Sequence, residues 1–118
     1  MDLNKMIMTL KEHQDSDKMG MIASHLGMVR KTSPDGREVT GLEVIYDQNI
    51  IQDIINDIKK MPGIIEVLIE LKEGPLKVGD EVMVVAVGGD VRENVFAGLI
   101  HAVNRIKAEA CKKKEFFR

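Results

Sequence analysis

The chain has 118 residues, 44% of them hydrophobic and 31% charged, which predicts one folded domain over residues 1–118 and excludes a disordered chain. A membrane span is excluded because no apolar run approaches ~18 residues, and the 3% aromatic content excludes a stacking platform for single-stranded nucleic acid. The net charge of −2 argues against a general nucleic-acid or membrane binder, but residues 105–118 carry +4 and the other residues −6.

The first half of the chain begins with a predicted helix and two predicted strands. Apolar residues repeat at helical spacing over residues 2–13, so a short helix is expected there. Residues 19–30 and 39–46 are predicted to be strands. Between them, Ser33-Pro34-Asp35-Gly36 is typical of a turn, because Pro fixes φ and Gly accepts a positive φ. The two strands are therefore expected to form a hairpin.

The second half alternates helices and strands. Isoleucines at the helical period predict an amphipathic helix over residues 48–60, which Pro62-Gly63 ends. Residues 64–71 and 81–87 are predicted to be strands, the second of them buried because it is apolar throughout. A final helix is expected over residues 91–110, whose apolar stripe recurs every three to four residues.

These elements follow the order α-β-β-α-β-β-α, with residues 74–80 as a connection. The order predicts an α+β fold, a two-layer sandwich of the α/β-hammerhead kind with a mostly antiparallel sheet and the helices on one side.

Arg92 is a candidate anion-binding residue because it begins the last predicted helix, directly after Gly88-Gly89-Asp90. Backbone N–H groups at a helix start attract anions, and a guanidinium can grip a phosphate or carboxylate with two donors. The glycine patterns of phosphate loops and dinucleotide sites are absent. From the pattern alone, a solvated surface arginine is the favoured interpretation, and Arg30, beside the turn, has the same ambiguity.

Lys107 and Lys114 are seven residues apart, so they would share one face if the last helix continued through Cys111. Clustered amines lower one another's pKa, and a lysine so tuned can act as a base or nucleophile. The alternative is a solvated helix end whose cations complement the helix dipole. Cys111 has no identifiable base and is read as a buried or incidental thiol. No metal site is predicted, because His13, His25 and His101 share no ligand spacing.

Residues 76–115, LKVGDEVMVVAVGGDVRENVFAGLIHAVNRIKAEACKKKE, resemble the large, catalytic subunit of molybdopterin synthase. That family carries Gly-Asp before a strand, an Arg and then a Phe at the start of a long helix ending in Lys, and a basic tail with Glu. The positions in register are Gly79-Asp80, Arg92, Phe96, Lys107, Lys114 and Glu115. Upstream, Gly27-Met28-Val29-Arg30 resembles the family's Gly-x-Val-Arg and Leu42-Glu43 its Leu-Glu strand start, so the resemblance covers about residues 19–115.

The resemblance implies a homodimer that binds, on each protomer, a small ubiquitin-like sulfur-carrier subunit. The carrier's C-terminal Gly-Gly thiocarboxylate would enter a basic pocket and donate sulfur to cyclic pyranopterin monophosphate, and two transfers would make the dithiolene of molybdopterin. No metal or redox cofactor is implied, and the protein is expected in the cytoplasm. Carried over to this chain, Arg30 and Arg92 bind anionic groups of the substrates, together with the catalytic lysines Lys107 and Lys114.

The division of labour between those lysines stays open. Lys107 would stabilise charge or move a proton near the thiocarboxylate, and Lys114 would contact the pterin or act as the covalent or acid–base lysine.

Three positions depart from the family pattern. Val91 replaces the His that usually precedes the Arg, His25 replaces an aromatic residue, and Cys111 replaces the Pro of the tail. The sequence also stops at Arg118, where relatives commonly continue into a Trp-containing tail. The alternative hypothesis is therefore a non-catalytic relative that binds the carrier without turnover. A binder of nucleic acid or an acidic partner through residues 112–114 is a third hypothesis, which requires affinity that falls steeply with salt.

Overall fold

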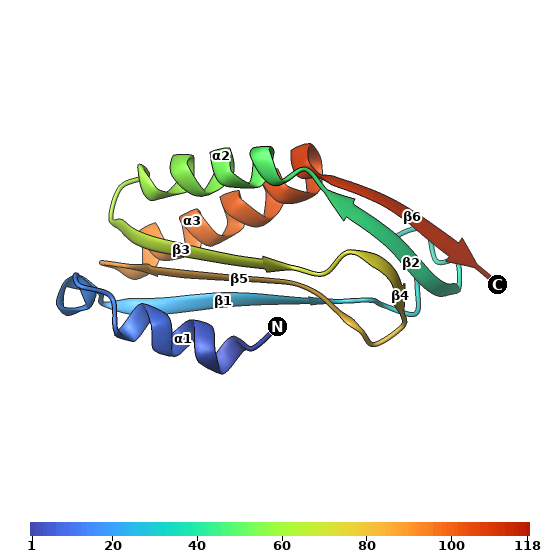
Figure 1. Ribbon diagram of the computed structural model, residues 1–118, viewed down its shortest axis with the longest axis horizontal. Coiled ribbons are helices and arrows are strands. Elements are labelled where there is room, and N and C mark those ends of the chain that lie inside the picture. Colours follow the sequence, from blue (N-terminus) through green and yellow to red (C-terminus); the bar gives the residue numbers. More distant parts are fainter.

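The computed structural model describes residues 1–118 as two three-stranded antiparallel sheets with helices packed on them, in a molecule 49 × 25 × 23 Å across (Figure 1). The helices are α1 (Leu3–Lys11), α2 (Gln48–Lys59) and α3 (Arg92–Arg105), with a 3₁₀ turn η1 (Ser16–Lys18) and a π-helical turn η2 (Ile106–Ala110). The strands are β1 (Met21–Met28), β2 (Val39–Tyr46), β3 (Ile64–Leu71), β4 (Gly74–Lys77), β5 (Glu81–Gly89) and β6 (Cys111–Phe117). The predicted α+β class and antiparallel pairing are confirmed.

The first sheet has the strand order β1-β5-β3, and its central strand is covered on both faces. Successive residues of a strand point to opposite faces, so Val84 and Ala86 pack against α1 while Val85 and Val87 join the core under α2 and α3. Figure 1 shows α1 on the opposite side of this sheet from α2 and α3. The prediction of helices on one side only is wrong, because both sets of alternating β5 residues are apolar and each needs a cover.

Helix α2 is attached to this sheet by its isoleucines. Ile54 and Ile58 are fully buried and Ile51 nearly so, and burying one such side chain contributes about 1.5–3 kcal/mol. Asp47 is the N-cap of this helix, and its carboxylate accepts hydrogen bonds from two backbone N–H groups of the first turn. After the helix, Gly63 has a φ of +74°, and a Cβ at this position would collide with the Asp90 side chain, so glycine is required.

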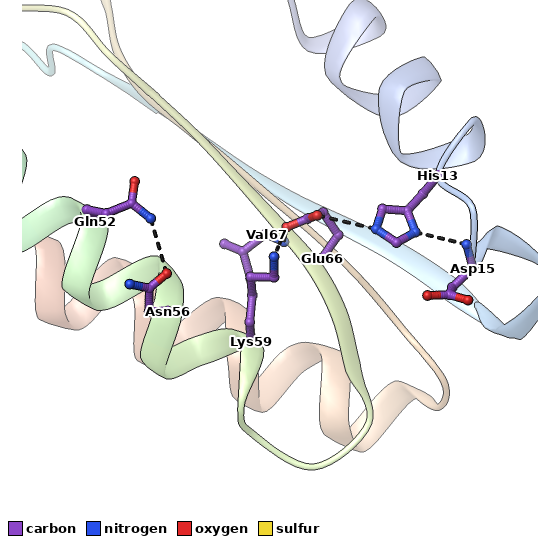
Figure 2. A network of polar contacts seen from close by, with 7 residues as sticks. All are labelled: His13, Asp15, Gln52, Asn56, Lys59, Glu66 and Val67. Atoms are coloured by element: carbon purple, nitrogen blue, oxygen red, sulfur yellow. Dashed lines mark hydrogen bonds and ion pairs between the residues drawn. The ribbon is translucent and has the colours of Figure 1, made fainter.

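A polar network around Glu66 ties α1 to the other side of the molecule (Figure 2). His13, just after α1, lies with Nε2 3.3 Å from Glu66 Oε2, and its Nδ1 accepts a hydrogen bond from the backbone N–H of Asp15. Lys59, at the end of α2, lies with Nζ 3.3 Å from Glu66 Oε1. One half-buried carboxylate on β3 therefore joins the ends of two helices that cover opposite faces of the sheet.

The second sheet has the order β4-β2-β6 and is covered on one face only. Its central strand alternates: Leu42, Val44 and Tyr46 are buried in the same core as the first sheet, while Glu43 and Ile45 are exposed. Strand β6 pairs with β2 so that Cys111 lies opposite Tyr46 and Lys113 opposite Val44. This sheet forms one end of the long axis in Figure 1.

The predicted hairpin between the first two strands is wrong. β1 pairs with β5, and β2 pairs with β4 and β6 instead. The turn at Ser33–Gly36 does form, but only one isolated bridge, Thr32 to Glu38, crosses it. The predicted connection 74–80 also contains strand β4. A turn signal is local, whereas the choice of strand partner depends on which buried faces must meet, so it is decided by residues far apart in the sequence.

The largest correction concerns the end of the chain. The final helix was expected to reach Ala110 and, for the two lysines to share a face, to continue through Cys111. The α-helix ends at Arg105, the next turn is π-helical, and residues 111–117 form strand β6. Arg105 secures this end, with its guanidinium 2.7 Å from both Asp57 of α2 and Glu109. The order of elements thus gains a sixth strand after the last helix.

Candidate functional site

A cavity of about 470 Å³ lies at the junction of the two sheets. Its wall comes from β1, β2, β5, the π-helical turn η2 and β6, and nine of its thirteen lining residues are hydrophobic if Tyr46 and Cys111 are included. The polar or reactive lining residues are His25, Tyr46, Lys107, Cys111 and Lys113. An apolar cavity of this size with a few convergent polar groups is the usual form of a small-molecule site.

The lysines at the end of the chain lie on the two faces of strand β6. Cys111 and Lys113 line the cavity, as strand alternation requires of residues two apart. Lys114 lies on the opposite face, above the ring of Phe116 at 5.4 Å, and lines a separate outer depression with Glu43 and Lys112, which Lys113 also borders. The expected pairing of Lys107 with Lys114 on one helix face is therefore wrong, and the amine that shares the cavity with Lys107 belongs to Lys113.

The two candidate arginines lie outside this cavity. Arg92 begins α3, fifteen residues before Lys107, so the two are separated along the helix by roughly 22 Å at 1.5 Å per residue. Arg30 follows β1 and donates from Nε to the carbonyl oxygen of Thr32 at 2.7 Å. One protomer therefore brings only Lys107, of the four predicted residues, into the cavity.

Tyr46 and Lys113 were missed by the sequence reasoning. The signal for Lys113 is weak, because three consecutive lysines give both faces of a strand the same residue and hide a period of two. Tyr46 follows the alternation of the correctly predicted strand 39–46, which places it on the buried face, but nothing in its own segment indicates that Cys111 is its neighbour.

Burial and the two lysines set the electrostatics of the cavity. Burial, followed by the charge of Lys107, lowers the pKa of His25, so this imidazole is neutral at pH 7. Burial raises the pKa of Cys111 although Lys113 and Lys107 oppose the rise, and the thiol is therefore protonated at pH 7. Burial, followed by the neighbouring Cys111, raises the pKa of Tyr46 to about 12.

Two exposed lysines and no carboxylate are among the residues that line this cavity. The cavity can receive an anion, and the neutral imidazole, thiol and phenol around the amines supply short-range hydrogen bonds. No group of three or more His, Cys, Asp or Glu residues is placed to hold a metal ion. None of the helices is long and apolar enough to cross a membrane.

Comparison with known proteins identifies the fold family. A family model described as MoaE protein matches residues 1–109. The chain belongs to the MoaE family. This membership confirms the resemblance to the large subunit of molybdopterin synthase that residues 76–115 indicate. No curated protein matches the chain.

Solved structures of the MoaE fold agree over most of the chain. The structure of molybdopterin synthase from Staphylococcus aureus is 25% identical in sequence and superposes with a TM-score of 0.74. The alignment covers 86% of this chain and 77% of the Staphylococcus aureus chain. Molybdopterin cofactor biosynthesis protein E from Burkholderia multivorans is 27% identical, with 100% and 82% covered and a TM-score of 0.79. A complex of subunits 1 and 2 of molybdopterin-converting factor from Helicobacter pylori, at 15% identity, 100% and 80% coverage and a TM-score of 0.73, shares the fold.

Proposed function

We propose that this MoaE protein is the large subunit of a molybdopterin synthase and works in the cytoplasm. It would transfer sulfur from the C-terminal Gly-Gly thiocarboxylate of a small ubiquitin-like carrier subunit to cyclic pyranopterin monophosphate, without a metal or redox cofactor of its own. Family membership supports the role in molybdenum cofactor biosynthesis. The observation that carries the chemistry is the cavity with Lys107 and Lys113, because both the thiocarboxylate and the phosphorylated pterin are anions.

Lys107 is the central residue of the proposal. It belongs to the π-helical turn η2 between α3 and β6, and it reaches a cavity whose other walls are largely apolar. Its side chain is exposed, so the ammonium group can meet an entering anion at the cavity and pair with negative charge that develops on the thiocarboxylate or the leaving carboxylate. Lys113 supplies the second cation from β6. Lys114 stays a predicted substrate-binding and catalytic residue, now on the outer face of that strand.

A homodimer explains how Arg92 could contribute. Within one protomer Arg92 is at the far end of α3 from the cavity, whereas a second protomer packed with its α3 start near this cavity would bring the guanidinium to it. Arg92 is exposed, as this arrangement requires. Arg30 lies one residue after the buried Val29, close to the cavity rim at Met28, so it could meet the carrier tail or the phosphate as they enter.

The decisive experiment is reconstitution. Purified protein is mixed with thiocarboxylated carrier and cyclic pyranopterin monophosphate, and the dithiolene product is measured. We expect product with the wild-type protein and a loss of about 10²–10³-fold in kcat for Lys107→Ala, the range for removing one donor to a developing anion. Lys60→Ala, which removes an exposed lysine at the end of α2, is the matched control and should keep full activity. Full activity of Lys107→Ala would overturn the assigned role.

The second candidate is a carrier-binding protein without turnover. Val91 favours it, because this residue stands where the family usually has His, and as the N-cap residue before α3 it makes no side-chain hydrogen bond. Co-purification with a carrier ending in Gly-Gly but no product, under conditions in which a relative with the His is active, would support this candidate. Product formation would exclude it.

A further inference from the structure

His25 is the polar group of the cavity whose hydrogen bonding is incomplete. Its Nδ1 atom is buried and has no hydrogen-bond partner. The ring lies along β1 above Gly27, where a Cβ would be 3.2 Å from the imidazole Cε1, so the glycine leaves space for this ring position. Buried polar atoms are nearly always paired, because an unpaired one costs about 1–3 kcal/mol. Nδ1 is closed off in this ring position, but His25 lines the cavity, so a turn of the ring would present the unpaired nitrogen to a ligand there.

The groups around His25 are cationic or neutral. Those from elements packed against it are Lys107 of η2, Tyr46 of β2 and Cys111 and Lys113 of β6, while β5 contributes the apolar Val82 and Met83. No carboxylate among the lining residues offsets the lysines. The imidazole is consequently neutral in the free protein, through burial and the charge of Lys107.

We propose that His25 is a ligand-contacting residue of the MoaE cavity, which binds an anionic ligand through Nδ1 and takes up a proton when that anion pairs with Lys107. The family pattern has an aromatic residue at this position, and no sequence motif assigns a role to the histidine that replaces it here. An anion beside Lys107 offsets the positive charge that opposes the imidazolium, and it also accepts the hydrogen bond that the new N–H provides. The proton comes from solvent, and the protonated ring then faces the bound ligand as an acid.

The anion has two possible sources that share this chemistry: the terminal carboxylate or thiocarboxylate of the carrier tail, and the phosphate of the pterin. The two named anions rest on the proposed function. The location of the binding site rests on the cavity alone. Proton uptake has a defined sign: affinity for the anion rises as the pH falls through the range in which His25 is neutral in the free protein.

The test is a titration that needs no turnover. The imidazole signals of His25, assigned by their loss in His25→Asn, are followed by NMR against pH with inorganic phosphate in one arm and a peptide ending in a Gly-Gly carboxylate in the other. We expect the titration midpoint of His25 to rise in the arm whose anion occupies the cavity, and that arm identifies the source. A midpoint unchanged in both arms, whether or not the lysine signals move, overturns the proposal.

Two variants distinguish the contribution of the His25 hydrogen bond to anion affinity from the contribution of proton uptake. His25→Asn keeps an acceptor close to the Nδ1 position but does not titrate, and His25→Phe fills the ring volume without either property. We expect affinity for the active anion to fall about five- to tenfold in His25→Phe and less in His25→Asn, with the His25-linked pH dependence lost in both. His101→Asn, on an exposed position of α3, should change neither quantity. Equal binding by wild type and His25→Phe at every pH contradicts the inference.

The outcome is separable from that of the proposed function. If the synthase assay fails but His25 gains a proton with an anion, the cavity is an anion site of different use. If the assay succeeds and His25 does not respond, the sulfur transfer stands and only the role of His25 falls.

Discussion

The central strands of the two sheets, β5 and β2, are buried in different ways. From Met83 to Gly89 every residue of β5 is buried, because helices cover both faces of its sheet. β2 alternates, with a buried face toward the shared core and an exposed face that carries Glu43 and Ile45. The first sheet holds most of the apolar burial, while the second offers a half-open surface on which charged side chains can lie next to a cavity. Stability therefore depends mainly on the first sheet, whereas the candidate site needs both sheets, because its cavity lies where they meet.

The largest difference is expected in stability. Ile54→Ala, in the helix that covers the first sheet, should lower the free energy of unfolding by about 2–5 kcal/mol, because it leaves a cavity at a fully buried site. Ile45→Ala, at a position 54% exposed on β2, should change it by no more than about 0.5 kcal/mol. Chemical denaturation measures both. Equal losses in the free energy of unfolding would mean that the two sheets contribute equally to stability.

The lysines of β6 sharpen the comparison within the second sheet. Lys113→Ala should reduce kcat in the reconstituted reaction by about tenfold to a hundredfold, because Lys113 lines the cavity with Lys107. Lys114→Ala should have the smaller effect, since its side chain lies on the outer face above Phe116. The larger loss for Lys114→Ala would restore the expectation from the sequence and contradict the cavity as the reaction site.

A substitution in the polar network of Figure 2 tests whether that network helps to hold the helices on the two faces of the first sheet. Glu66→Gln removes the charge that His13 and Lys59 share, and it should cost about 1 kcal/mol because the carboxylate is half-buried. Glu70→Gln, at an exposed position of the same strand, is the control and should be neutral within about 0.5 kcal/mol. A neutral result for Glu66→Gln would show that apolar packing alone positions α1.

The smallest effect concerns Cys111. A raised thiol pKa means less thiolate at any given pH, so the rate of alkylation by iodoacetamide should reach its half-maximum at a higher pH than for an unfolded chain. Lys113→Ala should move that midpoint further upward, because it removes a cation that favours the thiolate. The pH–rate profile distinguishes this from simple shielding, which slows alkylation equally at every pH. A downward shift would assign Cys111 a reactive thiolate instead.

The sequence by itself determined the elements whose period is unambiguous. Strands 39–46 and 64–71 were predicted with the bounds that the structure has, and the isoleucine helix predicted over 48–60 ends one residue earlier. These segments bury one regular stripe or face, so their pattern is complete within a dozen residues. Lys107 was also identified from the sequence, through its register with the family, and the structure places it in the cavity.

The tertiary structure decided what depends on distant neighbours. Nothing local in CKKKEFF selects a strand over a further helical turn, since identical lysines conceal the period of two and no Gly or Pro ends the helix. Pairing with β2 supplies the missing hydrogen bonds and makes this segment β6. That one long-range choice turns Lys114 outward, brings Lys113 and Cys111 beside Lys107 and His25, and so forms the cavity from four segments that are separate in the sequence.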